Sequence, residues 1–290
     1  MSPRARVIAV VSAAAALAVG ATVGGTILQT RGESTGTTAR KGSPPLELPA
    51  SAALRLYQAG KHAQAEALFA RSHTLAGEIG VAFSRWPHGT LDELKRLVSA
   101  NPRSALAELH LGLAYYWSGR DADAVASWRR AAAVDPDTPY AVSALDFLHP
   151  NVAPQLPPIV VDAATVPRAA RAELVRGADL WNRERPVSAR KALAAALALA
   201  PRDPAVQTAA AVALFSPATP LRPFPKLGPL TGSYPKAAVV RFHLGVLLLW
   251  TRQVGKGERE LRLAIAEAPG SGYAVTAKGI LRALAKDGTG

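Results

Sequence analysis

The sequence of 290 residues contains no cysteine, and this absence excludes several kinds of site. Without cysteine the chain has no disulfide, no thiolate ligand for a metal ion and no redox dithiol. Aromatic residues make up only 6% of the chain, and residues typical of β-strands are too sparse to support an all-β fold. The stability of the folded chain must therefore come from the packing of apolar side chains.

Apolar residues make up 49% of the sequence, and alanine is the most frequent of them. Alanine has the highest intrinsic helix propensity, and its small side chain lets two helices approach each other closely. The composition therefore predicts an all-α protein with tightly packed helices.

The net charge of +13 is distributed unevenly along the chain. Residues 51–150 contain ten Lys and Arg and ten Asp and Glu, whereas residues 151–290 contain nineteen and nine. A basic surface favours anionic partners such as acidic proteins, lipid headgroups or wall polymers. The alternative is an Arg-rich surface that is simply solvated. We expect no nucleic acid among the partners.

Residues 7–28 form a run without any charged side chain, after a short tail, residues 1–6, that contains Arg4 and Arg6. About 20 apolar residues in a helix span the hydrocarbon core of a bilayer. Basic residues before the run predict that the N-terminus stays inside and the rest of the chain lies outside. The run therefore predicts a transmembrane helix that acts as a signal anchor.

A cleaved signal peptide is the alternative interpretation of this run, with Val19 and Ala21 as candidate cleavage-site residues. The next segment, residues 29–50, is rich in Gly, Ser, Thr and Pro. Such a composition cannot bury enough apolar surface to offset the entropy lost on ordering. It predicts a flexible linker.

Three stretches of the chain share one template of residue sizes. In each, a glycine is followed 24 positions later by a proline, in the pairs Gly112 and Pro136, Gly177 and Pro201, and Gly245 and Pro269. Eight positions before each proline stands a large apolar residue: Trp128, Leu193 and Leu261. Glycines are expected where two antiparallel helices cross closely, large residues between such crossings, and prolines where a helix ends.

The stretch 105–138 resembles the tetratricopeptide repeat family, whose period is 34 residues. It carries the signature positions of that family as Leu111, Gly112, Tyr115, Gly119, Ala124, Trp128, Ala131 and Pro136. The stretches 170–203 and 238–271 match the family pattern more loosely. The resemblance implies a fold of stacked helical hairpins, an α-α superhelix.

The repeats themselves belong to a larger duplicated unit. Residues 110–112 (His-Leu-Gly) recur as residues 243–245, 133 positions later. This duplication predicts two tetratricopeptide-like arrays, residues 51–148 and residues 169–286. Between them, residues 149–168 contain five prolines and the apolar run Ile159–Val161, which predicts a proline-rich linker or crossover.

The second array departs from the first in one segment. Pro223, Pro225 and Pro229 interrupt the stretch that matches a helix in the first array. We therefore expect residues 216–235 to form an extended, partly polyproline loop. Its role is open between a binding or gating loop and the tolerated loss of one helix.

In the tetratricopeptide family, one face of the first helix of each hairpin lines a concave groove that binds peptides. Carried over to this chain, that face consists of Leu109, His110, Leu113, Tyr116, Trp117, Trp181, Phe242, His243, Val246, Leu249 and Trp250. Aromatic residues in such a groove would anchor a partner protein. The alternative is that the two halves bury these side chains against each other as core.

His110 and His243 stand at matching places in this set, and each has two interpretations. A histidine on a binding face can sense pH or bind peptide carbonyls. It can equally be a buried side chain whose hydrogen bonds are satisfied.

The sequence contains no motif for catalysis, for a metal site or for a cofactor. We therefore expect a protein that is not an enzyme. The resemblance implies a single-pass protein of the bacterial cell membrane, with extracytoplasmic repeats that bind other proteins as a scaffold or assembly factor. The alternatives are a module that binds an anionic polymer or membrane surface through its basic C-terminal half, and a structural protein that forms homo-oligomers.

Overall fold

The computed structural model describes residues 42–288. The predicted transmembrane helix, residues 7–28, lies outside this range, as does most of the predicted linker before the first array. Among residues 42–288, no helix combines the length and the apolar character that crossing a membrane requires. Every regular element in the same range is a helix, so the all-α prediction is confirmed there.

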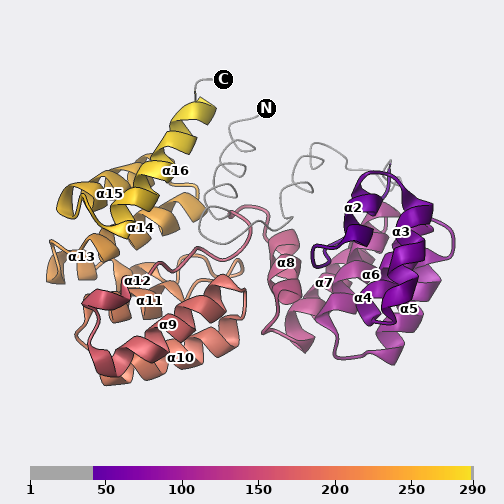
Figure 1. The fold of residues 1–290 in the computed structure, drawn as a ribbon, viewed down its shortest axis with the longest axis horizontal. Helices are drawn as coiled ribbons and strands as arrows, with labels where there is room; N and C mark the ends of the chain where they lie inside the picture. Colours follow the sequence, from indigo (N-terminus) through magenta and orange to yellow (C-terminus); the bar gives the residue numbers. More distant parts are fainter. Residues whose placement is uncertain (1–41, 289–290) are drawn as a thin grey trace. The chain divides into compact units, whose positions relative to one another are not determined.

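The described residues divide into two compact units, residues 42–148 and residues 149–288. We call them the first unit and the second unit (Figure 1). The predicted linker, residues 149–168, belongs to the second unit.

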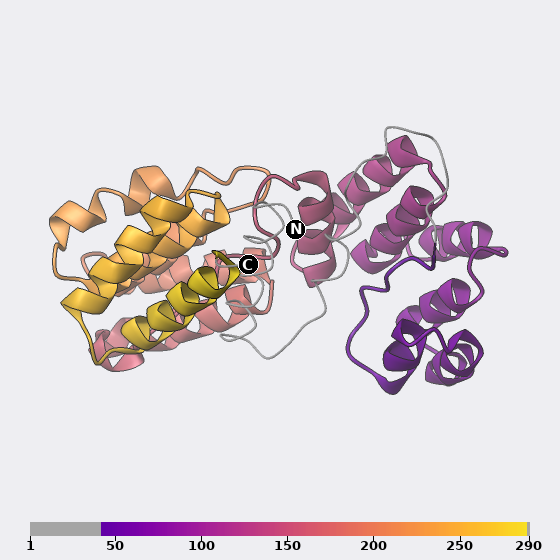
Figure 2. The ribbon, with the colours of Figure 1, turned by 90° about the horizontal axis from the view of Figure 1, so that it is seen from above.

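The first unit consists of three helical hairpins and a closing helix, each element packed on its neighbours along the chain (Figures 1 and 2). Its elements are α2 (Ala52–Gln58), α3 (His62–Phe69), η2 (Ala70–Ser72), α4 (Leu75–Ser84), α5 (Thr90–Ala100), α6 (Ala105–Trp117), α7 (Asp121–Val134) and α8 (Pro139–Leu148). The first helices of the hairpins are α2, α4 and α6.

The second unit has a similar order of elements. They are η3 (Ala163–Thr165), α9 (Arg168–Asn182), α10 (Pro186–Leu199), α11 (Pro204–Val212), α12 (Phe224–Leu227), α13 (Leu230–Ser233), α14 (Ala238–Trp250), α15 (Val254–Glu267) and α16 (Gly272–Gly288). Here the first helices are α9, α11 and α14, and α12 and α13 stand in the place of α5. In the place of α8, α16 packs on α15 and α14.

The glycines of the repeat template lie where the two helices of a hairpin touch. An added Cβ atom would lie 2.4 Å from the Trp128 ring at Gly112, 2.6 Å from Leu193 at Gly177, and 2.9 Å from Leu261 at Gly245. No side chain fits into these spaces without displacing its neighbour. The template therefore predicted the close crossings correctly, residue by residue.

The prolines of the template also act as expected. The helices α7, α10 and α15 end two residues before Pro136, Pro201 and Pro269. A residue that precedes proline is pushed out of the helical conformation, and proline itself lacks the N–H that the helix needs.

The prediction of an extended loop over residues 216–235 was wrong in part, because α12 and α13 lie within it. Pro223 and Pro229 are the N-cap residues of these four-residue helices, and Pro225 lies in the first turn of α12. Proline is tolerated in a first turn, whose N–H groups have no partner within the helix. Leu227 and Leu230 are buried, so the two short helices pack onto the unit.

Two segments without helix precede the arrays, and both are packed rather than free; in the second, residues 150–155 form turns and bends before the extended part. We call residues 43–49 the first segment and residues 150–162 the second segment. Leu46 in the first and Ile159 in the second are each only 2% exposed. The prediction of a flexible linker is therefore wrong for the end of residues 29–50, because the apolar side chains of that end are buried against helices that follow much later in the sequence.

Candidate functional site

In the first unit, side chains of the first helices hold the main chain of the first segment. The Tyr57 hydroxyl of α2 donates a hydrogen bond of 2.6 Å to the carbonyl of Pro44. The Glu47 amide donates one of 3.2 Å to Nε2 of His110 on α6. Together with Phe83 of α4 and Trp117 of α6, Tyr57 and His110 form what we call the first segment-binding face.

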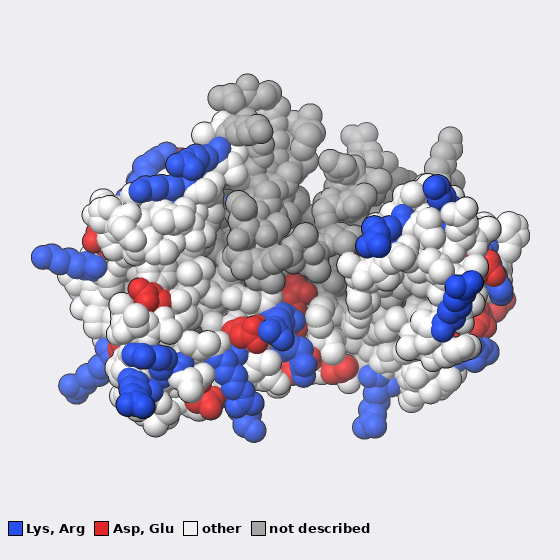
Figure 3. All heavy atoms as spheres, viewed as in Figure 1, with Lys and Arg blue, Asp and Glu red and all other residues white. Residues whose placement is uncertain are grey.

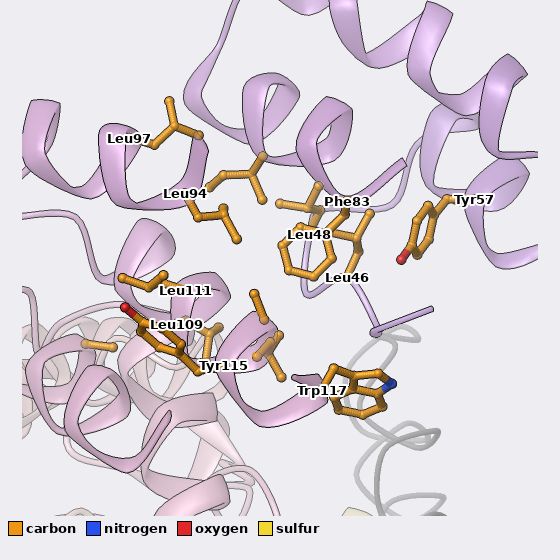
Figure 4. Packing of buried hydrophobic residues seen from close by; sticks show 14 of the residues in the cluster. Leu46, Leu48, Tyr57, Phe83, Leu94, Leu97, Leu109, Leu111, Tyr115 and Trp117 are labelled. Atoms are coloured by element: carbon orange, nitrogen blue, oxygen red, sulfur yellow. The ribbon is translucent and has the colours of Figure 1, made fainter. Parts of the chain in front are cut away.

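Apolar side chains complete this contact. Leu46 and Leu48 belong to one cluster of buried side chains with Phe83, Leu109 and Trp117. Figure 4 shows Leu46 and Leu48 beside Phe83, among helices that belong to separate hairpins. Alternate residues of an extended chain point to the same side, so both leucines reach the helices together.

In the second unit the second segment is held in the same way, with more hydrogen bonds. Asn182 of α9 pairs with both main-chain groups of Ile159: its Oδ1 accepts from the amide at 3.0 Å and its Nδ2 donates to the carbonyl at 2.9 Å. Trp181 Nε1 donates to the carbonyl of Pro157 at 2.7 Å.

Residues of α14 and α16 hold the two ends of the second segment. His243 Nε2 accepts from the Val160 amide at 3.0 Å, and the Tyr273 hydroxyl accepts from the Asp162 amide at 3.1 Å. Trp250 Nε1 donates to the Gln155 carbonyl at 3.1 Å. These side chains, Trp181, Asn182, His243, Trp250 and Tyr273, form the second segment-binding face.

The two histidines are neutral hydrogen-bond acceptors. Nδ1 of His110 donates to the Leu106 carbonyl at 2.8 Å, and Nδ1 of His243 donates to the Val239 carbonyl at 2.7 Å. Each Nε2 is therefore free to accept from a segment amide. Burial lowers the pKa of both histidines to about 4, so they stay neutral near pH 7. This favours the second interpretation, buried histidines with satisfied hydrogen bonds, over pH sensing near neutrality.

Glu47 is the one ionisable side chain in the central part of the first segment. Burial raises its pKa to about 7, because the carboxylate loses water when the segment packs against the helices. Val160 occupies the matching position of the second segment. An acidic residue thus stands in the first segment where the second has an apolar one.

The structure buries most of the residues predicted to bind a partner. Leu109, Leu113, Phe242, Val246 and Leu249 are inaccessible core residues of their units, and Tyr116 is half-buried against Trp117 and Trp128. His110, Trp117, Trp181, His243 and Trp250 lie on the segment-binding faces. Their contact with a partner protein stays a prediction, but the nearest occupant of each face is the chain itself.

Sequence reasoning missed Tyr57, Asn182 and Tyr273, which hold the segments by hydrogen bonds. Tyr273 had a usable signal, since it recurs 133 positions after Tyr140. Asn182 had none, because the matching residue of the first unit is Gln58 and a single Asn at a helix end is common.

Among residues 42–288, no group of three or more His, Asp or Glu side chains is placed to hold a metal ion. The polar groups on the segment-binding faces point to peptide main chain. The arrangement binds an extended polypeptide.

No family model matches the sequence, and no curated protein matches it. Among solved structures, the chain is similar to the TPR2AB-domain:pHSP90-complex of yeast Sti1, with 13% identity, a TM-score of 0.34, and coverage of 81% of this chain and 95% of that chain. It is also similar to YrrB, described as a TPR protein with an unusual peptide-binding site, with 15% identity, a TM-score of 0.31, and coverage of 79% and 99%. The template residues and the hairpins of the chain itself make its repeats tetratricopeptide-like.

Proposed function

We propose that this chain is a membrane-tethered protein-interaction module of the bacterial cell envelope, with its repeats outside the cytoplasm, where it acts as a scaffold or assembly factor. One observation carries the proposal: in each unit the first helices bind an extended polypeptide through its main chain. The tether rests on the uncharged run over residues 7–28 and on the basic residues before it.

The chemistry of the faces suits a protein partner. Tyr57 donates to a peptide carbonyl and His110 accepts from a peptide amide, and every polypeptide offers both groups. The apolar side chains beside them bury alternate side chains of an extended chain. Main-chain hydrogen bonds then supply affinity, and the apolar contacts supply specificity.

Binding to an anionic polymer or membrane surface is a second candidate, favoured by the excess of ten positive charges in residues 151–290. On the face shown in Figure 3, Lys and Arg side chains form several separate groups with Asp and Glu among them. This function requires binding that weakens steeply with salt, so retention of binding in moderate salt would rule it out. Self-association is tested by light scattering, where a monomer at all concentrations would exclude it.

The protein-interaction function is tested by site-specific photocrosslinking in intact cells that express the full chain. A photoreactive residue at the exposed Gln58, at the end of α2, lies beside the first segment-binding face. The matched control is the exposed Arg129 on α7, the second helix of its hairpin.

We expect Gln58 to yield crosslinks to another protein in the membrane fraction, and Arg129 to yield none to that protein. Crosslinks from Gln58 that contain only this chain, or the same products from both positions, would contradict the proposal. Recovery of the chain in the soluble fraction would contradict the membrane tether but not the protein-interaction function.

A further inference from the structure

The two segments share a sequence pattern, at an offset that differs from that of the later helices. Residues 44–48 read Pro-Pro-Leu-Glu-Leu, and residues 157–161 read Pro-Pro-Ile-Val-Val, 113 positions later. The later helices of the arrays match at 133 positions instead. The two segments therefore form a matched pair with the pattern Pro-Pro-aliphatic-X-aliphatic.

Three parts of this pattern have equivalent contacts in both units. The carbonyl of the first proline accepts from Tyr57 in the first unit and from Trp181 in the second. The aliphatic side chain two positions later is buried. The amide of the next residue donates to His110 in the first unit and to His243 in the second. Two different segments thus dock by one set of contacts, which is evidence that the faces recognise the pattern.

The two segments differ in how firmly they are held. Six hydrogen bonds join the main chain of residues 155–162 to side chains of the second face. Among the residues that the structure describes, two such bonds join the main chain of residues 44–49 to the first face. Each additional hydrogen bond adds to the free energy of docking, so the difference affects docking strongly.

The sequence supplies the reasons for three of the four additional bonds. Gln58 stands at the position of Asn182 and is exposed, so the paired contact to the aliphatic residue is absent from the first unit. Pro49 stands at the position of Asp162, whose amide donates to Tyr273. Proline has no N–H to donate, so Tyr140, which matches Tyr273, cannot receive this bond.

We propose that the first segment-binding face exchanges its own segment for an extended segment of another protein with the pattern Pro-Pro-aliphatic-X-aliphatic, while the second face keeps its own segment as a fixed part of the fold. The inference rests on the proposed function and names the partner's recognition sequence. The first segment is then an internal competitor that sets a threshold for partner binding.

A covalently attached competitor has a large advantage over a free one. A short connection gives the first segment an effective concentration of about millimolar at its own face. A partner must bring further contacts or a high local concentration to displace it. Replacing Leu46 and Leu48 removes this competition. The affinity of the first segment-binding face for a free peptide can then be measured.

The test uses the full chain in detergent and a fluorescent peptide with the sequence of residues 42–50, followed by fluorescence anisotropy. We expect the peptide to bind a variant with Leu46→Ser and Leu48→Ser at least about tenfold more tightly than it binds the wild type. A peptide with serine in place of both leucines should not bind. The matched control variant, Ile159→Ser with Val161→Ser, should gain no affinity, since its main-chain hydrogen bonds remain.

Amide hydrogen exchange of the wild type tests the same inference without any substitution. The Glu47 and Val160 amides both donate to a buried histidine, so their exchange compares the opening of the two segments directly. We expect Glu47 to exchange at least about tenfold faster than Val160, relative to free peptides.

Equal protection of the two amides would overturn the proposal, and so would a folded Leu46→Ser, Leu48→Ser variant that does not bind the peptide. If that variant does not fold, the exchange measurement decides alone. Dimers of the wild type that dissociate when peptide is added would make a second copy the occupant and would overturn the assignment to another protein. Failure of peptide binding, together with specific crosslinks from Gln58, would refute the recognition sequence but leave the protein-interaction function standing.

Discussion

The two units use one design with two strengths of attachment. In both, an extended segment crosses the first helices and gives one amide to a buried histidine. In the second unit Asn182 and Tyr273 form additional hydrogen bonds with the segment. The first unit lacks these bonds, because Gln58 replaces Asn182 and Pro49 replaces Asp162. The comparison teaches that substitutions at two positions account for three of the four hydrogen bonds by which the two attachments differ. The predictions below test this difference.

The largest effect is expected from the buried aliphatic residues. Ile159→Ala should lower the free energy of unfolding of the second unit by about 2–5 kcal/mol, as is usual for a buried aliphatic residue. Leu46→Ala should lower that of the first unit by less, because the loss cannot exceed the free energy of docking the segment. Hydrogen exchange with mass spectrometry reads the two units separately. Equal losses would mean that both segments are integral to the fold.

A smaller effect is expected where the two faces differ in their amide side chains. Asn182→Ala leaves both main-chain groups of Ile159 without their partner and should destabilise the second unit by about 1–3 kcal/mol. Gln58→Ala, at the matching exposed position, should change the stability of the first unit by less than about 0.5 kcal/mol. Urea denaturation of the two variants measures both values. A large loss for Gln58→Ala would show an attachment of the first segment that its hydrogen bonds do not explain.

The smallest effect is a loss of stability towards neutral pH that only the first unit should show. Burial raises the pKa of Glu47 to about 7, so the packed state favours the protonated carboxyl. Its contribution is complete below pH 4.5, the ordinary value, and is lost as the pH rises through about 7. Glu47→Gln should therefore slow opening of the first segment near pH 8 and change little near pH 4.5, as measured by hydrogen exchange corrected for the intrinsic rate.

The histidines work in the opposite direction and in both units. Burial lowers the pKa of His110 and His243 to about 4, so their contribution is complete above pH 6.5 and is lost as the pH falls through about 4. The stability of the second unit should show only this loss at low pH, because that unit has no counterpart of Glu47. Val160→Glu should give the second unit the additional loss towards neutral pH. A second segment with that substitution and no such loss would contradict the role assigned to Glu47.

The helical hairpins could be predicted from sequence because their determinants are local and repeated. Gly112 and Trp128 are separated by 16 positions, and the same pair of sizes recurs as Gly177 with Leu193 and Gly245 with Leu261. A contact that forms within one hairpin and recurs in three leaves a pattern in the sequence. The structure confirms each of these contacts.

The segment-binding faces could not be predicted in the same way. The first segment looks like a spacer, because prolines and small residues surround its two leucines. Its match with the second segment lies at 113 positions rather than 133, so the duplication of the arrays does not reveal it. The offset changes partly because α9 and α10 have 15 and 14 residues, whereas α2 and α3 have 7 and 8. The burial of Leu46 depends on α6, more than fifty residues away.

Each segment precedes its array in the chain, and this order matters during synthesis. Glu47 leaves the ribosome 63 residues before His110, and Val160 leaves it 83 residues before His243. The apolar residues of each segment therefore stay exposed to solvent until the array is nearly complete. In that state they can pair with other nascent chains. Two consecutive prolines before the buried aliphatic residue of each segment reduce that hazard, since proline cannot donate to a growing sheet. The Pro-Pro pair that begins the docked pattern thus also disfavours aggregation of the nascent chain.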